Sequence, residues 1–112
     1  MKTLTFKLST NNEEVINGSS NYFIKENVMN FIINEETYSY NLDNNILIKK
    51  NNESSICINP NESIIHITLL EQNLTFDMEI IDFKVKNDDN EIIYEYSFMS
   101  DEKTTNCITI DY

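Results

Sequence analysis

The 112-residue chain has no arginine and no alanine, and it holds a single glycine, a single proline and a single histidine. All eight basic residues are therefore lysines, and the formal net charge is −11. Binding to nucleic acid needs a basic surface for the phosphates, and reading of bases favours arginine. The composition thus argues against a nucleic-acid partner, and the negative charge also disfavours anionic membrane surfaces.

Long apolar runs are missing as well. No stretch approaches the roughly 20 apolar residues of a membrane span. Residues 1–6 alternate between polar and apolar instead of forming the apolar segment of a signal peptide. We therefore expect a cytoplasmic protein with no membrane partner. The lack of arginine and alanine beside abundant isoleucine, asparagine and lysine is typical of the codons of an AT-rich bacterial genome.

Residues that carry enzyme or metal chemistry are few and scattered. Cys57 and Cys107 have no metal-binding or redox spacing, so we expect two reduced structural thiols. His66 would need a cysteine beside it to take part in nucleophilic catalysis. The acidic run 88–91 lacks the alternating ligands and central glycine of a calcium loop. We expect no catalytic site, no metal ion and no cofactor.

Alternation of polar and apolar residues dominates the chain, most clearly between Leu74 and Met99. Apolar residues occupy every second position from Leu74 to Ile80, which is the period of a strand with one buried face. Ile80 and Ile81 then stand side by side, and the apolar positions beyond them shift by one residue. This shift predicts a β-bulge or bend that lets one strand serve two parts of a curved sheet.

The same period recurs along the rest of the chain, with short polar connections. Gly18 falls inside the second strand, where it predicts another bend or bulge. In the third strand Ile32 lies on the face opposite Phe31, so we expect that strand to be nearly buried on both faces. The expected strands cover residues 4–9, 14–25, 28–34, 37–42, 46–50, 54–58, 63–70, 74–86, 92–98 and 104–112.

The short connections decide the fold class. Strands joined in this way pair as antiparallel neighbours, which predicts an up-and-down meander. A meander of so many strands leaves two unpaired edges unless it closes on itself. We therefore predict one all-β domain over residues 1–112, an antiparallel β-barrel of about eight to ten strands. The bends near Gly18 and Ile80 would be its corners.

Three segments carry a likeness to a known family. Residues 91–96 and 106–110 resemble the closing hairpin of the YwiB-like family of small bacterial proteins, and residues 21–25 resemble that family's second strand. The likeness follows the strand order over nearly the whole chain. It implies a calycin-like (lipocalin-like) β-barrel, and it implies no activity, because the family's function is unknown.

Aromatic residues at alternating strand positions are the candidates for a binding site. In a narrow barrel they fill the core, whereas in a wider one they line a pocket with tyrosine hydroxyls as its polar groups. Our first hypothesis is a non-catalytic protein that binds a small, partly apolar ligand inside the barrel. The alternative is a protein-interaction or structural module, such as a homodimer, with a filled barrel. The candidate ligand-binding residues are Tyr38, Tyr40, Phe76, Tyr94, Tyr96 and Phe98.

Overall fold

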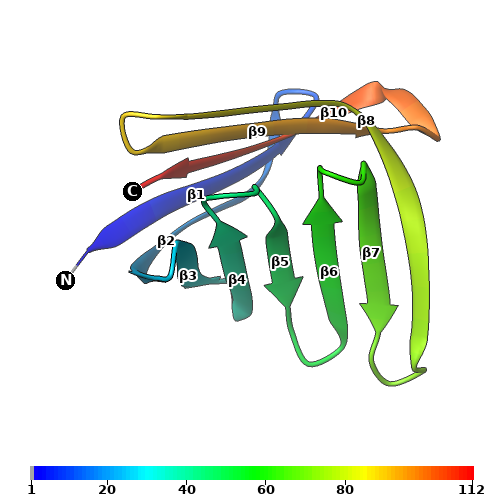
Figure 1. Ribbon diagram of the computed structural model, residues 1–112, viewed down its shortest axis with the longest axis horizontal. Coiled ribbons are helices and arrows are strands. Elements are labelled where there is room, and N and C mark those ends of the chain that lie inside the picture. The colour runs from blue at the N-terminus through cyan, green and yellow to red at the C-terminus, as the bar shows by residue number, and fades with distance from the viewer. Residues whose placement is uncertain (1) are drawn as a thin grey trace.

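The computed structural model describes residues 2–112, so Met1 lies outside it. These residues form ten antiparallel strands that close into an up-and-down barrel (Figure 1). They contain no helix of the length and apolarity needed to cross a membrane. The predicted all-β closed meander is confirmed. The strands are β1 (Thr3–Thr10), β2 (Glu13–Lys25), β3 (Val28–Ile33), β4 (Glu36–Asn41), β5 (Leu47–Lys50), β6 (Ser54–Asn59), β7 (Ile64–Leu69), β8 (Leu74–Asp88), β9 (Glu91–Phe98) and β10 (Asp101–Asp111).

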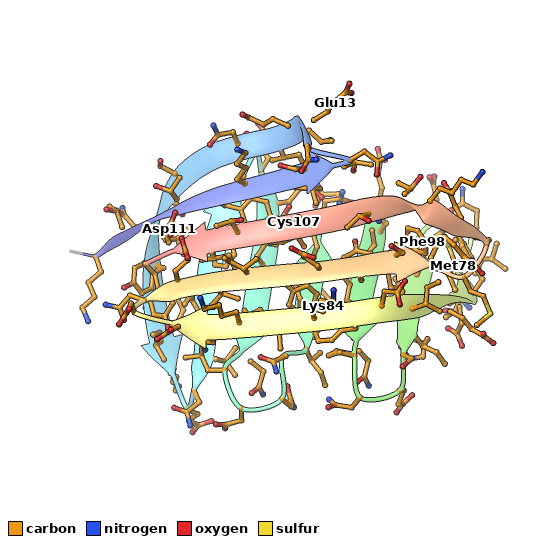
Figure 2. The ribbon with its side chains drawn as sticks, turned by 90° about the horizontal axis from the view of Figure 1, so that it is seen from above. Glu13, Met78, Lys84, Phe98, Cys107 and Asp111 are labelled. Atoms are coloured by element: carbon orange, nitrogen blue, oxygen red, sulfur yellow. The ribbon has the colours of Figure 1, made fainter. Side chains whose placement is uncertain are left out.

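The barrel is built from two sheets that share β2 and β8. The upper sheet in Figure 1 contains β1, β10 and β9, with residues 13–21 of β2 on one side and residues 80–88 of β8 on the other. The lower sheet contains β3 to β7, with residues 22–25 of β2 and residues 74–79 of β8. Seen from above, the lower strands run across the upper ones (Figure 2). The two shared strands are thus the corners of the barrel.

The corner in β8 falls where the apolar phase of the sequence shifts. Its pairing with β9 changes register between Ile81 and Lys84. Asp82 lies inside this irregularity and has a φ of 53°. The extra residue turns the chain, so that Ile80 before it and Val85 after it both face the interior. The bend predicted at Ile80–Ile81 is confirmed.

The corner in β2 lies between Asn21 and Tyr22, where the pairing passes from β1 to β3, and not at Gly18 as expected. The register with β1 shifts between Leu8 and Ser9, which leaves Val15 as the extra residue of β2. Gly18 lies beyond this bulge, paired with Phe6. A Cβ atom on Gly18 would come within 3.1 Å of Cγ2 of Ile33. The missing side chain therefore serves close packing near the corner rather than a bulge.

The core lies between the inner faces of the two sheets. Ile32 is 59% exposed, because nothing covers the outer face of β3, so the expectation that this strand is nearly buried on both faces was wrong. The buried apolar residues are Leu4, Phe6, Met29, Phe31, Ile33, Tyr38, Tyr40, Leu47, Ile58, Ile65, Ile80, Ile92, Tyr94, Tyr96, Ile108 and Ile110.

Four hairpins turn through two residues that both have positive φ. These pairs are residues 11–12, 26–27, 34–35 and 89–90. Two successive positive φ values are the geometry of a type I′ turn, whose twist matches that of the flanking strands. Asparagine and aspartate tolerate this conformation better than most residues, and they fill six of these eight positions, with Glu26 and Glu35 at the other two. The turns therefore fix the register of the barrel with almost no glycine.

We expect Asp82→Val to lower the free energy of unfolding by about 1–2 kcal/mol, because a β-branched residue is strained at positive φ. Asp82→Gly removes the same exposed carboxylate but tolerates this backbone conformation, so it should match or exceed the wild type. Urea denaturation of both variants measures the difference. Equal stabilities would contradict the left-handed geometry of the bend.

Candidate functional site

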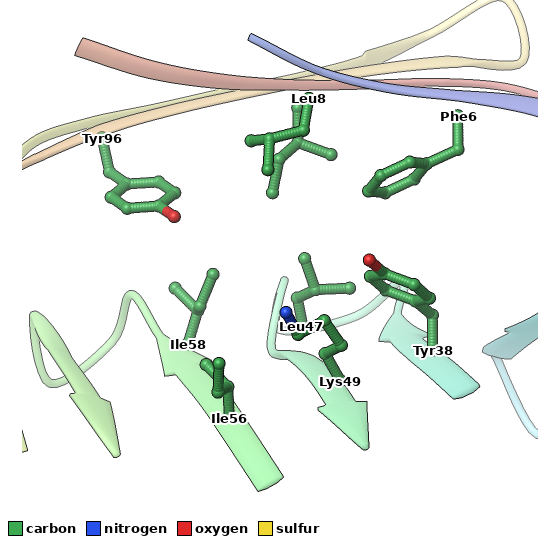
Figure 3. Close-up of a pocket in the computed structure, with 9 residues that line it drawn as sticks. Phe6, Leu8, Tyr38, Leu47, Lys49, Ile56, Ile58 and Tyr96 are labelled. Atoms are coloured by element: carbon green, nitrogen blue, oxygen red, sulfur yellow. The ribbon is translucent and has the colours of Figure 1, made fainter. Parts of the chain in front are cut away.

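A cavity of about 100 Å³ lies between the two sheets (Figure 3). The upper sheet contributes side chains from β1, β9 and β10, which point down, and the lower sheet contributes side chains from β4, β5 and β6. Most of the wall is hydrocarbon, so the cavity favours an apolar occupant. The lining residues are Phe6, Leu8, Tyr38, Leu47, Lys49, Ile56, Ile58, Tyr96 and Ile108.

Two tyrosine hydroxyls face this space. Those of Tyr38 and Tyr96 point inward from opposite sheets (Figure 3). Burial raises the pKa of Tyr96 to about 12. Burial, followed by the nearby Glu36 carboxylate, raises the pKa of Tyr38 to about 12 as well. Both hydroxyls therefore keep their protons at neutral pH and can donate hydrogen bonds to a ligand.

Lys49 is the one charged residue among residues 2–112 that lines the cavity. It pairs with Tyr38 in the ladder between β4 and β5, which places its side chain on the inner face of the barrel. Its Nζ lies 3.2 Å from Oε2 of Glu36. The same Oε2 also accepts a hydrogen bond of 3.3 Å from Asn51. Lys49 was not among the candidates from the sequence, although it has the same strand phase as the buried Leu47.

Of the six aromatic candidates, only Tyr38 and Tyr96 line the cavity. Tyr40 and Tyr94 are fully buried, and both of their hydroxyls donate hydrogen bonds to Asn45. Tyr40 donates to its side-chain oxygen at 2.6 Å, and Tyr94 donates to its backbone carbonyl at 3.0 Å. These two tyrosines tie the connection between β4 and β5 to the core.

Phe98 and Phe76 lie outside the cavity wall. Phe98 is half-buried, and its ring meets that of Tyr96 edge-on at 5.8 Å, so it supports Tyr96. Phe76 faces the interior side of β8 opposite Ile67, but it is 43% exposed. This end of β7 and β8 extends beyond the upper sheet, as Figure 1 shows. Phe76 therefore belongs to an uncovered apolar rim.

Asn106 adds an unpaired donor to the interior. It is only 9% exposed and lies on the same face of β10 as Ile108, next to Tyr96 in the ladder. Its side-chain oxygen accepts a hydrogen bond of 3.1 Å from Thr10. Its Nδ2 is buried without a hydrogen-bond partner among residues 2–112. An unpaired buried donor is costly, and a ligand or water that accepts from it would relieve that cost.

A second group of reactive residues lies on the outer face of the lower sheet. Cys57, His66 and Asp77 stand in one row across β6, β7 and β8, and Nδ1 of His66 lies 2.6 Å from Oδ1 of Asp77. The cysteine that nucleophilic catalysis requires is thus beside the histidine. However, burial and then the Glu62 carboxylate raise the pKa of the Cys57 thiol, which opposes formation of a thiolate. In residues 2–112 no three side chains converge to hold a metal ion.

Comparison with known families and with curated proteins finds no match to this chain. The likeness to the YwiB-like family therefore stays a prediction from the strand pattern. The cavity and its polar groups carry the functional argument by themselves.

Proposed function

We propose that the protein is a non-catalytic binding protein that holds a small, partly apolar ligand between its two sheets. The observation that carries the proposal is the apolar cavity with two tyrosine hydroxyls and one lysine on its wall. Ligand sites in proteins combine an apolar lining with a few polar groups that orient the ligand. Its volume of about 100 Å³ is smaller than the roughly 150 Å³ apolar cavity that holds benzene in another protein, so a ring of that size fits only with part of it at the open side of the cavity.

The closed meander also supports the calycin-like barrel that the YwiB-like resemblance implies. The net charge of −11 and the lack of arginine continue to favour a ligand other than nucleic acid. We place this binding function in the bacterial cytoplasm.

Filling the cavity should abolish binding without loss of the fold. Leu8 projects from β1 into the centre of the cavity (Figure 3). We expect Leu8→Phe to occupy this space, to keep or raise the melting temperature, and to eliminate binding of toluene in a calorimetric titration. Val15→Phe enlarges an exposed residue of β2 and serves as the control. Unchanged toluene binding by Leu8→Phe would place the ligand elsewhere.

An exposed apolar patch supports the alternative function, a protein-interaction module. Phe23 and Ile32 are both about 60% exposed and line one shallow depression on the outer face of β2 and β3. Exposed apolar patches of this kind favour protein contacts, here a homodimer. Native mass spectrometry separates the two hypotheses. A bound mass that denaturation removes supports the ligand, whereas a bare dimer that Phe23→Ser dissociates supports the interaction module.

A further inference from the structure

The polar groups that line the cavity can all donate hydrogen bonds, and the ammonium of Lys49 can only donate. Lys49 offers an ammonium group, and the buried hydroxyls of Tyr38 and Tyr96 keep their protons. Asn106, next to Tyr96 in the ladder, has a buried Nδ2 without a partner among residues 2–112, but it does not line the cavity. No carboxylate lines the cavity within the described residues. A ligand that supplies a strong acceptor would therefore satisfy all three groups at once, because each can donate to it.

Lys49 has N–H groups that remain free to donate hydrogen bonds to a ligand. Its ion pair with Glu36 occupies one of three N–H groups. Glu36 contacts Lys49 without lining the cavity, and Asn51 also donates to it, so the carboxylate is already satisfied. Both side chains are largely buried, at 28% and 19% exposure, which limits competition by water. Among the side chains that line the cavity, the hydroxyls of Tyr38 and Tyr96 are thus the only acceptors that the protein offers to the free N–H groups of Lys49.

The net negative charge of the protein does not prevent an anion from binding beside Lys49. The net charge of −11 repels anions at long range, but exposed charges are screened beyond about 8–10 Å at physiological salt. Inside the cavity the nearest charged group is an ammonium. A cationic ligand would be repelled by that ammonium and would find only neutral hydroxyls as acceptors, and a phosphate would need a larger and more strongly donating cradle.

We infer that the cavity binds a small monocarboxylate whose carboxylate accepts hydrogen bonds from Lys49 and the two tyrosine hydroxyls. The hydrocarbon part of the ligand would then pack against Leu8, Ile56 and other apolar side chains of the wall. The volume limits the ligand to a short branched acid or a single-ring acid that is only partly enclosed, with benzoate as the upper limit of size. The inference rests on the proposed function and adds to it the chemical class of the ligand.

Four probes of nearly equal size test the ligand class: benzoate, benzyl alcohol, toluene and benzylamine. Each is titrated into the full chain at neutral pH and followed by NMR. We expect benzoate to bind about tenfold or more tightly than toluene, since charge-assisted hydrogen bonds are the strong ones, and benzylamine to bind least. Toluene binding that equals or exceeds benzoate binding overturns the inference and leaves the proposed function standing. Failure of all four probes overturns the proposed function itself.

Lys49→Met locates the head group, because methionine keeps the length of the side chain and removes the charge. We expect benzoate affinity to fall about tenfold, to the level of toluene, with toluene affinity unchanged. Lys50→Met, at the exposed neighbouring position, is the matched control and should change neither. The variant Lys49→Met with Glu36→Gln avoids an unpaired carboxylate if the single variant is unstable. Retained benzoate preference in these Lys49 variants overturns the inference.

Discussion

Replacing Tyr94 with alanine is expected to lower the free energy of unfolding by about 3–5 kcal/mol, the cost of deleting a large aromatic ring from a packed core. Tyr94 is fully buried, and its ring meets those of Tyr40, Phe83 and Tyr96 edge-on, with centroids 4.8–6.2 Å away. These contacts join both sheets, since Tyr40 comes from β4 and Tyr94 from β9. The loss should therefore weaken the barrel as a whole.

Two controls separate the ring from its hydroxyl and from the strand. Tyr94→Phe removes only the hydrogen bond to the carbonyl of Asn45, which should cost about 1 kcal/mol. Glu95→Ala changes the next residue on the outer face and should stay within about 0.5 kcal/mol of the wild type. Urea denaturation gives all three values. A loss below about 1 kcal/mol for Tyr94→Ala would show that the interior is loosely packed at this point.

Alkaline pH should unfold the barrel cooperatively above pH 10. Burial raises the pKa of Tyr38 and of Tyr96 to about 12, and it raises the pKa of Tyr40 and Tyr94 even further. Tyrosines of the unfolded chain lose protons near pH 10, so the unfolded state binds fewer protons than the folded state from there upward. The stability is complete below pH 10 and is lost as pH rises toward 12. A tenfold difference in proton affinity corresponds to about 1.4 kcal/mol, so the four tyrosines together exceed an ordinary stability margin.

Circular dichroism and tyrosinate absorbance should change together in this titration. Tyr96→Phe removes one of the four buried hydroxyls. Between pH 7 and pH 12 its free energy of unfolding should therefore fall by less than that of the wild type. Tyr22→Phe is the matched control, because Tyr22 is half-buried at the rim, where its ring meets that of Tyr112. Tyrosinate absorbance that rises near pH 10 while the fold persists would contradict the burial of these hydroxyls.

Local patterns were enough to predict the fold. Strand period and turn residues are properties of neighbouring positions, and asparagine-rich turns with short spacing left few ways to connect the strands. The bend in β8 was also visible, because a bulge shifts the apolar phase of a single strand at Ile80 and Ile81. The bulge at Val15 was not visible in the sequence, because it appears only in the pairing register between β2 and β1.

The binding site could be predicted only in part, because it depends on how far one sheet covers the other. Tyr96 and Phe76 show the same alternation in the sequence, yet Tyr96 is 8% exposed and lines the cavity, whereas Phe76 is 43% exposed and does not. Lys49 carried a usable signal, a charge at an apolar strand position. The row of Cys57, His66 and Asp77 carried none, because it arises from pairing between three strands.

The pairing of β1 with β10 closes the barrel and forms part of the cavity wall. Every other pairing joins strands that follow one another in the chain, so those hairpins can form early and locally. Closure brings together the two ends of the chain and bears the largest loop entropy. Leu8 and Ile108, which both line the cavity, face each other across that pairing. The cavity therefore forms only when the barrel closes. A ligand bound there would stabilise the closed barrel and slow the separation of β1 from β10.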